Sequence, residues 1–524
     1  MTGISVARQL ADWNRRTFLL TGTCLPLVPL LEDRAEGIVL QRAAMPDYPF
    51  QLGVASGDPA PDGFVIWTRL APRPTEGGGM PAENLRVQWQ VYADEGLTKV
   101  VRQGSSVATP ALAHSVHVEV HGLEPNRWYW YRFKVGNDTS QVGRSRTMPA
   151  HDSMPDKLRF AFASCQHFEY GYFTVLEHLA QAELDLVVHL GDYIYEYAGA
   201  DNRVRKHTGP EITELVHYRN RLAQYHTDPH LQAAHANFPW LVTWDDHEFD
   251  NNYANMISEE PGVAVDAFLV RRANAYQAYY EHMPLRRRSV PRGPDMKLYR
   301  GVQFGRLADF DVLDTRQYRT DQPGGDGNKP LGDDAFDPAA TLLGSRQEKW
   351  LTRRLRHSPC RWNILAQQVM MARVDRTPGE AANFSMDQWP GYDLSRTRLI
   401  RFLADQRISN PVVLTGDIHK NWVNDLKIDF DKPDEATVAT EFVGTSITSG
   451  GDGPEETADH DGVMADNPFV KFYNAERGYV QCTLTPGQWR SDFQVVPYVT
   501  RPGAPLMTRA SFVVESDRPG ATRI

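Results

Sequence analysis

Residues that commonly bind metal ions stand directly after five short apolar segments of the sequence. They carry thiol, carboxylate, phenol and imidazole groups, and one segment is followed by an arginine. In chain order these residues are Cys165, Asp192, Tyr195, Asp246, His247, Asn252, Arg316, Asp417 and His419. Because the carboxyl ends of strands in an open α/β sheet meet at one edge, the pattern predicts that these side chains share one site.

The soft ligands in this set predict a transition-metal site. Cys165 offers a thiolate, Tyr195 a phenolate and His419 an imidazole, and Asp192 adds a carboxylate. A thiolate together with a phenolate suits Fe(III), so iron is the metal that this group favours. The simpler alternatives are a buried apolar thiol for Cys165 and ring packing for Tyr195.

The remaining ligands are oxygen donors. Asp246 and Asp417 offer carboxylates, Asn252 offers an amide oxygen, and Asp192 is shared with the soft group. Oxygen ligands alone suit Ca²⁺ or Mg²⁺. The sequence therefore predicts two kinds of metal in one site, with an ordinary turn cap as the alternative role of Asn252.

Strands that alternate with helices must position these residues. Helices are expected at 172–181, 345–356 and 396–406, and the second should open with a capping box at Ser345-Arg346-Gln347-Glu348. Continuous apolar strands are buried on both faces, so the pattern predicts an α/β domain with two sheets flanked by helices. The expected strands are 158–164, 184–190, 240–244, 310–313, 362–366, 412–415 and 441–445.

A different pattern, with partial apolar alternation, precedes this domain and predicts a small β-sandwich over residues 46–150. The spacing of Leu123, Pro125 and Tyr129 is typical of the tyrosine corner of fibronectin-like sandwiches. In that corner the tyrosine hydroxyl bonds back to an earlier part of the chain. Packing is the expected role of the other aromatic residues in this segment.

Composition limits the classes of function. The chain has 524 residues, enough for two domains and a leader, and a net charge of −10. An acidic protein lacks a general attraction for nucleic acid, so no nucleic-acid-binding surface is expected. The four cysteines lack CxxC spacing, and a Cys360–Cys482 disulfide is permitted.

The order of the motifs resembles that of the calcineurin-like metallophosphoesterases. Gly191-Asp192 with Tyr195 matches their Gly-Asp-x-x-Tyr motif, and Cys165 stands where their first acid occurs. Asp245-Asp246-His247-Glu248 and Gly416-Asp417-Ile418-His419 stand for Gly-Asn-His-Glu and Gly-His-x-His. These departures, with Gly-Val-Ala-Ser-Gly-Asp-Pro at 53–59, resemble the PhoD-like alkaline phosphatases over residues 46–500.

The resemblance implies one Fe³⁺ and one or two Ca²⁺ ions, bridged by Asp192. It also implies hydrolysis of phosphate monoesters, and of diesters, by a hydroxide bound between the cations. His247 is expected to protonate the leaving group or to bind the phosphate, and Arg316 to offset charge on the phosphate oxygens. The expected partner is thus a phosphate ester substrate.

The N-terminal residues resemble a twin-arginine export signal. Arg15-Arg16-Thr17-Phe18-Leu19 opens an apolar stretch that ends near Leu31. This stretch is too short and too rich in proline to span a membrane stably. We therefore expect recognition by the twin-arginine export machinery and a periplasmic or secreted location, with an amphipathic helix as the alternative.

The expected organisation is a leader at 1–45, a PhoD-like N-terminal domain at 46–150, a metallophosphoesterase domain at 151–510 and a tail at 511–524. Two other functions stay open. One is a dedicated phosphodiesterase of the phospholipase D-like or teichoic-acid type. The other is an inactive, metal-stabilised binding module.

Overall fold

The computed structural model describes residues 47–524 except 380 and 433. The described residues belong to one compact unit. The predicted leader at 1–45 lies outside them. Among the described helices, none is long and apolar enough to cross a membrane.

One large sheet contains seven strands in the order β12-β13-β15-β17-β19-β18-β20. Strands β13, β15, β17 and β19 are parallel, and the flanking strands are antiparallel. Their bounds, in that sheet order, are Arg300–Phe304, Ala308–Val312, Trp362–Ala366, Pro411–Thr415, Ala439–Val443, Asn421–Leu426 and Val470–Asn474.

The second large sheet contains ten strands in the order β24-β23-β22-β21-β9-β10-β11-β1-β2-β5. Its centre, from β9 to β1, is parallel. The strand bounds, in that order, are Arg518–Arg523, Met507–Glu515, Gln488–Val496, Arg477–Leu484, Leu158–Ala163, Leu186–His189, Pro239–Val242, Val54–Ala60, Gly63–Arg69 and Ser115–Val120.

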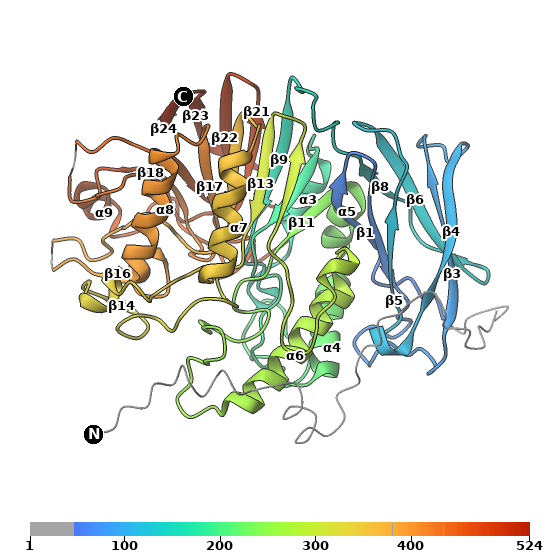
Figure 1. The fold of residues 1–524 in the computed structure, drawn as a ribbon. Helices are drawn as coiled ribbons and strands as arrows, with labels where there is room; N and C mark the ends of the chain where they lie inside the picture. The colour runs from blue at the N-terminus through green and yellow to red at the C-terminus, as the bar shows by residue number, and fades with distance from the viewer. Residues whose placement is uncertain (1–46, 380, 433) are drawn as a thin grey trace. The chain divides into compact units, whose positions relative to one another are not determined.

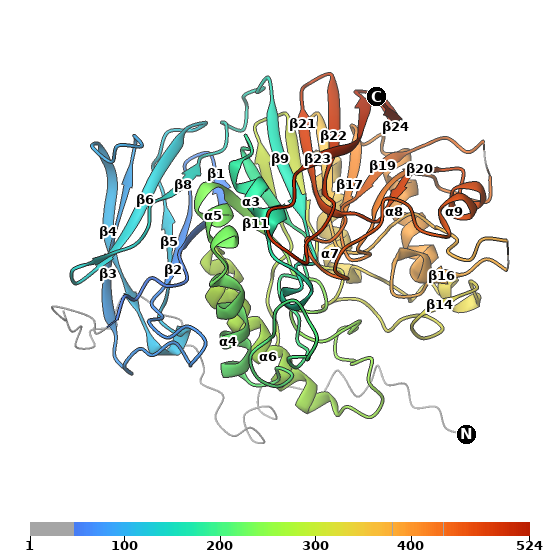
Figure 2. The same ribbon diagram turned by 180° about the vertical axis from the view of Figure 1, so that it is seen from behind.

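The two sheets face each other and are covered by helices on their outer faces (Figures 1 and 2). Apolar side chains of both sheets meet in a shared core that includes Phe160, Phe310 and Trp489. Outer cores pack helices against the ten-stranded and the seven-stranded sheet. The helices are α3 (Thr174–Gln181), α4 (Leu215–His226), α5 (Pro229–Asn237), α6 (Val265–His282), α7 (Gly344–His357), α8 (Asp393–Asp405) and α9 (His460–Asp466). Strands buried on both faces explain the continuous apolar segments.

A smaller sheet lies near the N-terminal end of the described chain and packs against β1, β2 and β5. In it the Tyr129 hydroxyl donates to the carbonyl of Glu124 at 3.2 Å and accepts from its N–H at 3.0 Å, as the tyrosine-corner spacing predicts. Because β1 pairs with β11, one layer of this sandwich is continuous with the main sheet. The smaller sheet contains β3 (Leu85–Tyr92), β4 (Val100–Ala108), β6 (Trp128–Val135), β7 (Asp138–Thr139) and β8 (Gly143–Arg146).

The expected strands and three expected helices are present, with ends shifted by a few residues. The capping box is wrong: the cap of α7 is Leu343, without a side-chain bond, and Gln347 instead donates to the carbonyl of Asp314 at 2.7 Å. The permitted disulfide is absent, since Cys360 and Cys482 are free thiols. A two-stranded sheet of β14 (Asn328–Lys329) and β16 (Phe384–Ser385) lies in the loops.

Candidate metal centre

Several predicted ligands have a left-handed backbone at or just after the end of a strand. The φ angles are 60° at Cys165, 55° at Asp192, 65° at Asp417 and 57° at His419. A residue other than glycine in this region costs on the order of 1–3 kcal/mol, and such residues cluster at functional sites. The turns after β9, β10 and β17 are therefore strained where the candidate ligands stand.

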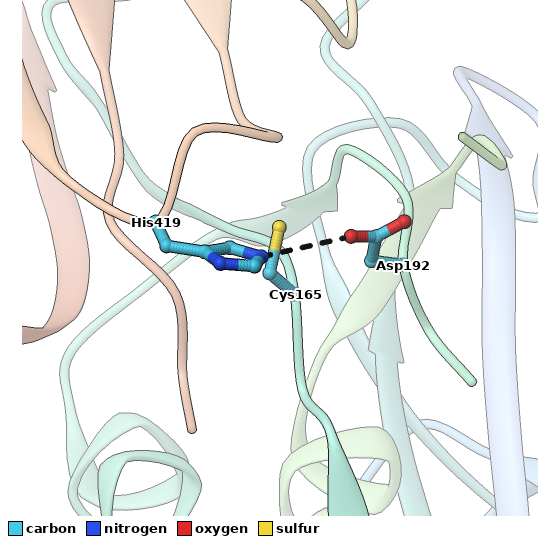
Figure 3. A group of neighbouring side chains, drawn as sticks. All are labelled: Cys165, Asp192 and His419. Atoms are coloured by element: carbon cyan, nitrogen blue, oxygen red, sulfur yellow. Dashed lines mark ion pairs between the residues drawn. The ribbon is translucent and has the colours of Figure 1, made fainter. Parts of the chain in front are cut away.

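The soft ligands are brought together as the sequence predicts. Cys165, Asp192 and His419 offer ligand atoms that all lie within 4.8 Å of one another (Figure 3). The Nε2 atom of His419 is 3.9 Å from Oδ2 of Asp192. The Tyr195 hydroxyl lies between them, 2.8 Å from Oδ2 of Asp192 and 3.2 Å from Nε2 of His419.

The protonation of this group depends on what occupies it. Burial, reinforced by nearby negative charge, raises the pKa of Cys165, Asp192 and Tyr195 well above the ordinary values. Burial lowers the pKa of His419 to about 3, which keeps the imidazole neutral, the form that binds metals. Without a cation these side chains thus favour their uncharged forms.

The donor atoms fit a cation. Oδ1 of Asp192 and Oδ2 of Asp245 are buried and have no hydrogen-bond partner among the described residues. A buried carboxylate oxygen without a partner is costly, and a bound metal ion would satisfy it. The set of thiol, phenol, imidazole and carboxylates also matches the ligand preferences of iron and calcium.

The carboxylates form a second and a third group beside the first, and the second group also includes the imidazole of His247. Asp192, Asp246 and His247 lie together, and so do Asp245, Asp246 and Asp417, each group within 4.8 Å. Asp192 therefore lies in both the first and the second group, and its role as a shared metal ligand stays a prediction. Asp245 is a candidate ligand that the sequence did not single out.

Arg316 has contacts that differ from the predicted role. Its side chain is fully buried and donates to Asp245, to Asp387 at 2.7 Å and to Asp417 at 3.3 Å. Its Nη2 atom is also 3.6 Å from Oδ2 of Asp246. Because it acts on four carboxylates, Arg316 is a positioning residue here, and its contact with phosphate stays a prediction.

Arg316 and burial compete for the protonation of this side, and burial raises the pKa of Asp245 well above its ordinary value. Burial opposes the charged form of Asp246, but Arg316 and His247 outweigh it and lower the pKa. For Asp417 burial dominates over Arg316 and raises the pKa to about 6. The arginine thus supplies part of the positive charge that these carboxylates need.

His247 lies beside the ligands in a fixed orientation. Its Nδ1 atom is 2.8 Å from Oε2 of Glu196, and its ring centroid is 4.2 Å from that of Tyr195. Burial opposes the imidazolium, but Glu196, Asp246 and Asp192 outweigh it and raise the pKa of His247 well above its ordinary value. The contact with Glu196 leaves Nε2 available for a ligand.

Asn252 contacts a predicted ligand through its backbone. Its N–H donates to Oδ2 of Asp246 at 2.8 Å, while its side-chain Nδ2 donates to Asp326 at 2.7 Å. Its φ of 47° matches the turn role that the sequence left open. A direct metal contact of Asn252 stays a prediction.

Two supporting residues were not predicted. Glu248 accepts the N–H groups of Asp192, Tyr193 and Asp245 at 3.1, 2.6 and 2.8 Å. Ser449 donates to the Tyr195 hydroxyl at 2.6 Å. Glu248 could have been found from its place beside Asp246-His247, whereas Ser449 carries no local signal.

Two facing sheets with acidic, thiol and imidazole side chains at one edge form the arrangement described above, and comparisons with known proteins show the class to which the chain belongs. Residues 160–493 match the PhoD-like phosphatase family, and residues 36–149 match the PhoD-like phosphatase N-terminal domain. Alkaline phosphatase D of Bacillus subtilis (strain 168) is 53% identical over 482 residues, which cover 91% of this chain and 82% of that protein.

A solved structure described as the structure of PhoD agrees with a TM-score of 0.90 at 53% identity, covering 92% of this chain and 93% of that chain. The chain belongs to the PhoD-like phosphatase family, and it is a phosphoric ester hydrolase. The family resemblance seen in the sequence is confirmed.

Proposed function

We propose that this phosphoesterase depends on metal ions and hydrolyses phosphate monoesters and, with the same residues, diesters. The proposal rests on three neighbouring ligand groups: the first and second share Asp192, and the second and third share Asp246. Two cations side by side can clamp a phosphate ester from both ends of the reacting bond. The similarity to alkaline phosphatase D of Bacillus subtilis supports this chemistry.

Each group of ligands suits a different ion. Cys165, Tyr195 and His419, with Asp192, would hold Fe³⁺. Asp246 and Asp417, with Asp192 and with Asn252 as an additional candidate, would hold one or two Ca²⁺ ions. When bound, such cations lower the pKa of water and offset the charge of the phosphate.

Other residues of the chain would position the metal ligands and supply a proton. His247, held through Nδ1 by Glu196 at 2.8 Å, would carry a proton on Nε2 and give it to the leaving alcohol. Arg316 would hold the carboxylates in place through its contacts with Asp245 and Asp417. Glu248 would fix the backbone of Asp192 through the 3.1 Å hydrogen bond.

The organisation of the chain is part of the proposal. Residues 1–45 would act as a twin-arginine signal that sends the protein to the periplasm or outside the cell. The fibronectin-like domain at 46–150 and the metallophosphoesterase domain at 151–510 would follow. The pairing of β1 with β11 would fix the first against the second.

The test is hydrolysis of p-nitrophenyl phosphate and bis(p-nitrophenyl) phosphate by the same preparation. Each rate is measured as isolated, after a calcium chelator, and after calcium is added back. Loss with the chelator and recovery with calcium are expected, and the two rates rank monoester against diester. A dedicated diesterase would cleave only the second compound. No cleavage of either compound, with iron and calcium present, would favour the inactive binding module.

A further inference from the structure

Two basic side chains beside the centre form no direct ion pair with a described residue, although Asp417 acts on the charge of Arg376 and Lys420 on that of Asp459. The arginines close to the oxygen ligands are paired: Arg316 contacts Asp245, and Arg319 donates to Asp387 at 2.7 Å. Arg376 and Lys420 form no ion pair with any carboxylate of the described residues. In an acidic protein, unpaired cations next to a phosphate site are candidate anion ligands.

Arg376 is connected to the centre through one side chain. Its Nη2 atom donates to Oε1 of Gln388 at 2.7 Å, and Nε2 of Gln388 donates to Oδ2 of Asp417 at 2.5 Å. Burial lowers the pKa of Arg376, although the charges of Asp417 and Tyr473 act to raise it. A partly buried cation without a bonded anion is unfavourable unless a ligand supplies the negative charge.

Lys420 lies beside the same centre, directly after the candidate ligand His419. Its Nζ atom donates to the Tyr473 hydroxyl and lies 4.8 Å from the centre of that ring. The Tyr473 ring stacks on His460 of α9 with 5.8 Å between the centroids, and the other end of α9 contacts the segment that carries Arg376. The nearby acid, Asp459, accepts from the Tyr473 hydroxyl at 3.4 Å.

The segment that carries Arg376 is held by the C-terminal end of α9, which lies next to β20 (Figure 2). The N–H of Asp375 donates to Oδ1 of Asn467 at 2.8 Å, and the N–H of Gly379 donates to Oδ2 of Asp466 at 2.9 Å. These bonds fix the residues on both sides of Arg376. A fixed cation loses less conformational entropy when it binds an anion.

We propose that Arg376 and Lys420 form a subsite for a second phosphate group, carried by the alcohol part of the substrate. The reacting phosphate would lie against the ligand groups. Arg376 is connected to Asp417 only through Gln388, so the second phosphate would bind at a distance from the first. This inference rests on the proposed function. The substrate class it names is a phosphate ester whose alcohol carries another phosphate.

Matched substrates test the subsite by catalysis. Propane-1,3-diyl bisphosphate and 3-hydroxypropyl phosphate differ by one phosphate group, and phosphate release is measured at saturating calcium. We expect kcat/KM to favour the bisphosphate by about tenfold or more, one charged contact being worth about that factor. The Arg376→Gln/Lys420→Gln double variant should reduce this preference to about the twofold statistical factor. The control, Arg401→Gln/Lys349→Gln, removes two exposed cations elsewhere and should keep it.

Calorimetry tests the subsite without catalysis. Propane-1,3-diylbis(phosphonate) should bind the unmodified protein about tenfold more tightly than propylphosphonate, and the double variant should reduce this difference to about the twofold statistical factor. If the protein bound propane-1,3-diylbis(phosphonate) with this preference but hydrolysed neither ester, the subsite would be supported and the proposed function would fail.

Two outcomes would overturn the subsite while leaving the proposed function intact. One is equal kcat/KM for both esters in the unmodified protein. The other is an equal loss on both esters in the double variant, because the cations would then act on the reacting phosphate itself.

Discussion

The soft side and the oxygen side of the centre differ in how their charge is balanced. Asp245, Asp246 and Asp417 share the buried guanidinium of Arg316. No described lysine or arginine forms a hydrogen bond or an ion pair with the side chain of Cys165 or Asp192. The oxygen side is therefore partly neutralised before any metal binds, whereas the soft side must take up a metal or keep its protons.

This difference explains how one site could hold two kinds of ion. A thiol and a phenol keep their protons when they are buried, and they lose them to a metal of high affinity. Asp246, whose pKa Arg316 and His247 lower, stays charged and can exchange a weaker ion such as Ca²⁺, whereas burial raises the pKa of Asp245 and Asp417. Asp192 joins the two sides, so its loss should affect both.

The largest effect is expected from Asp192→Asn. An amide at this position would weaken binding of both cations, each of which stabilises the transition state by several kcal/mol. We expect hydrolysis of p-nitrophenyl phosphate to fall at least about a thousandfold. The exposed Asp201→Asn serves as the matched control. A rate near that of the unmodified protein would remove Asp192 from the centre.

His247→Ala separates proton transfer from metal binding. If His247 protonates the leaving alcohol, its loss should slow alkyl phosphates about a hundredfold. Esters of p-nitrophenol, whose leaving group needs no proton, should be slowed much less. Rates on a series of leaving groups provide the measurement, with metal content as the control. An equal loss across the series would contradict the acid role.

Arg316→Met tests the charge balance of the oxygen side. Removing this cation leaves Asp245, Asp246 and Asp417 buried together, which should cost about 3–5 kcal/mol of folding free energy. Chemical unfolding with a calcium chelator present measures that loss, and added calcium should reduce it. The exposed Arg401→Met is the control. A loss that calcium does not change would argue against a calcium site next to Arg316.

Glu248→Gln should have the smallest effect. Its carboxylate accepts three backbone N–H groups, including that of Asp192 at 3.1 Å, and an amide would turn an N–H toward at least one of them. Residues that orient metal ligands typically change affinity or activity 10- to 100-fold. Titration of the calcium-free protein with calcium measures the shift. An unchanged calcium affinity together with unchanged activity would contradict this supporting role.

The sequence alone predicted that several candidate ligands lie together, because these residues follow strands directly. Cys165, Asp192 and Asp417 come after apolar segments that could be recognised, and parallel strands place such residues at one edge. The buried strands were equally visible, since they lack polar interruptions.

Other parts of the structure have no local signal. Ser449 reaches Tyr195 from 254 residues away, and Asp387 meets Arg316 from 71 residues away. Helices α4 and α6 were missed because their faces are not clearly divided into apolar and polar sides, and charged residues such as Arg221 and Arg272 are buried in them. The pairing of β1 with β11 is a long-range contact that strand patterns cannot give.

Metal analysis of the unmodified protein beside Cys165→Ser and Asp417→Asn provides the decisive comparison. Each preparation is loaded with iron and calcium, and the bound ions are counted per chain. We expect iron and calcium in the unmodified protein, loss of iron alone in Cys165→Ser, and weakened calcium binding with iron retained in Asp417→Asn. Loss of the same ion in both variants, or neither ion in the unmodified protein, would contradict a centre with one soft and one oxygen side.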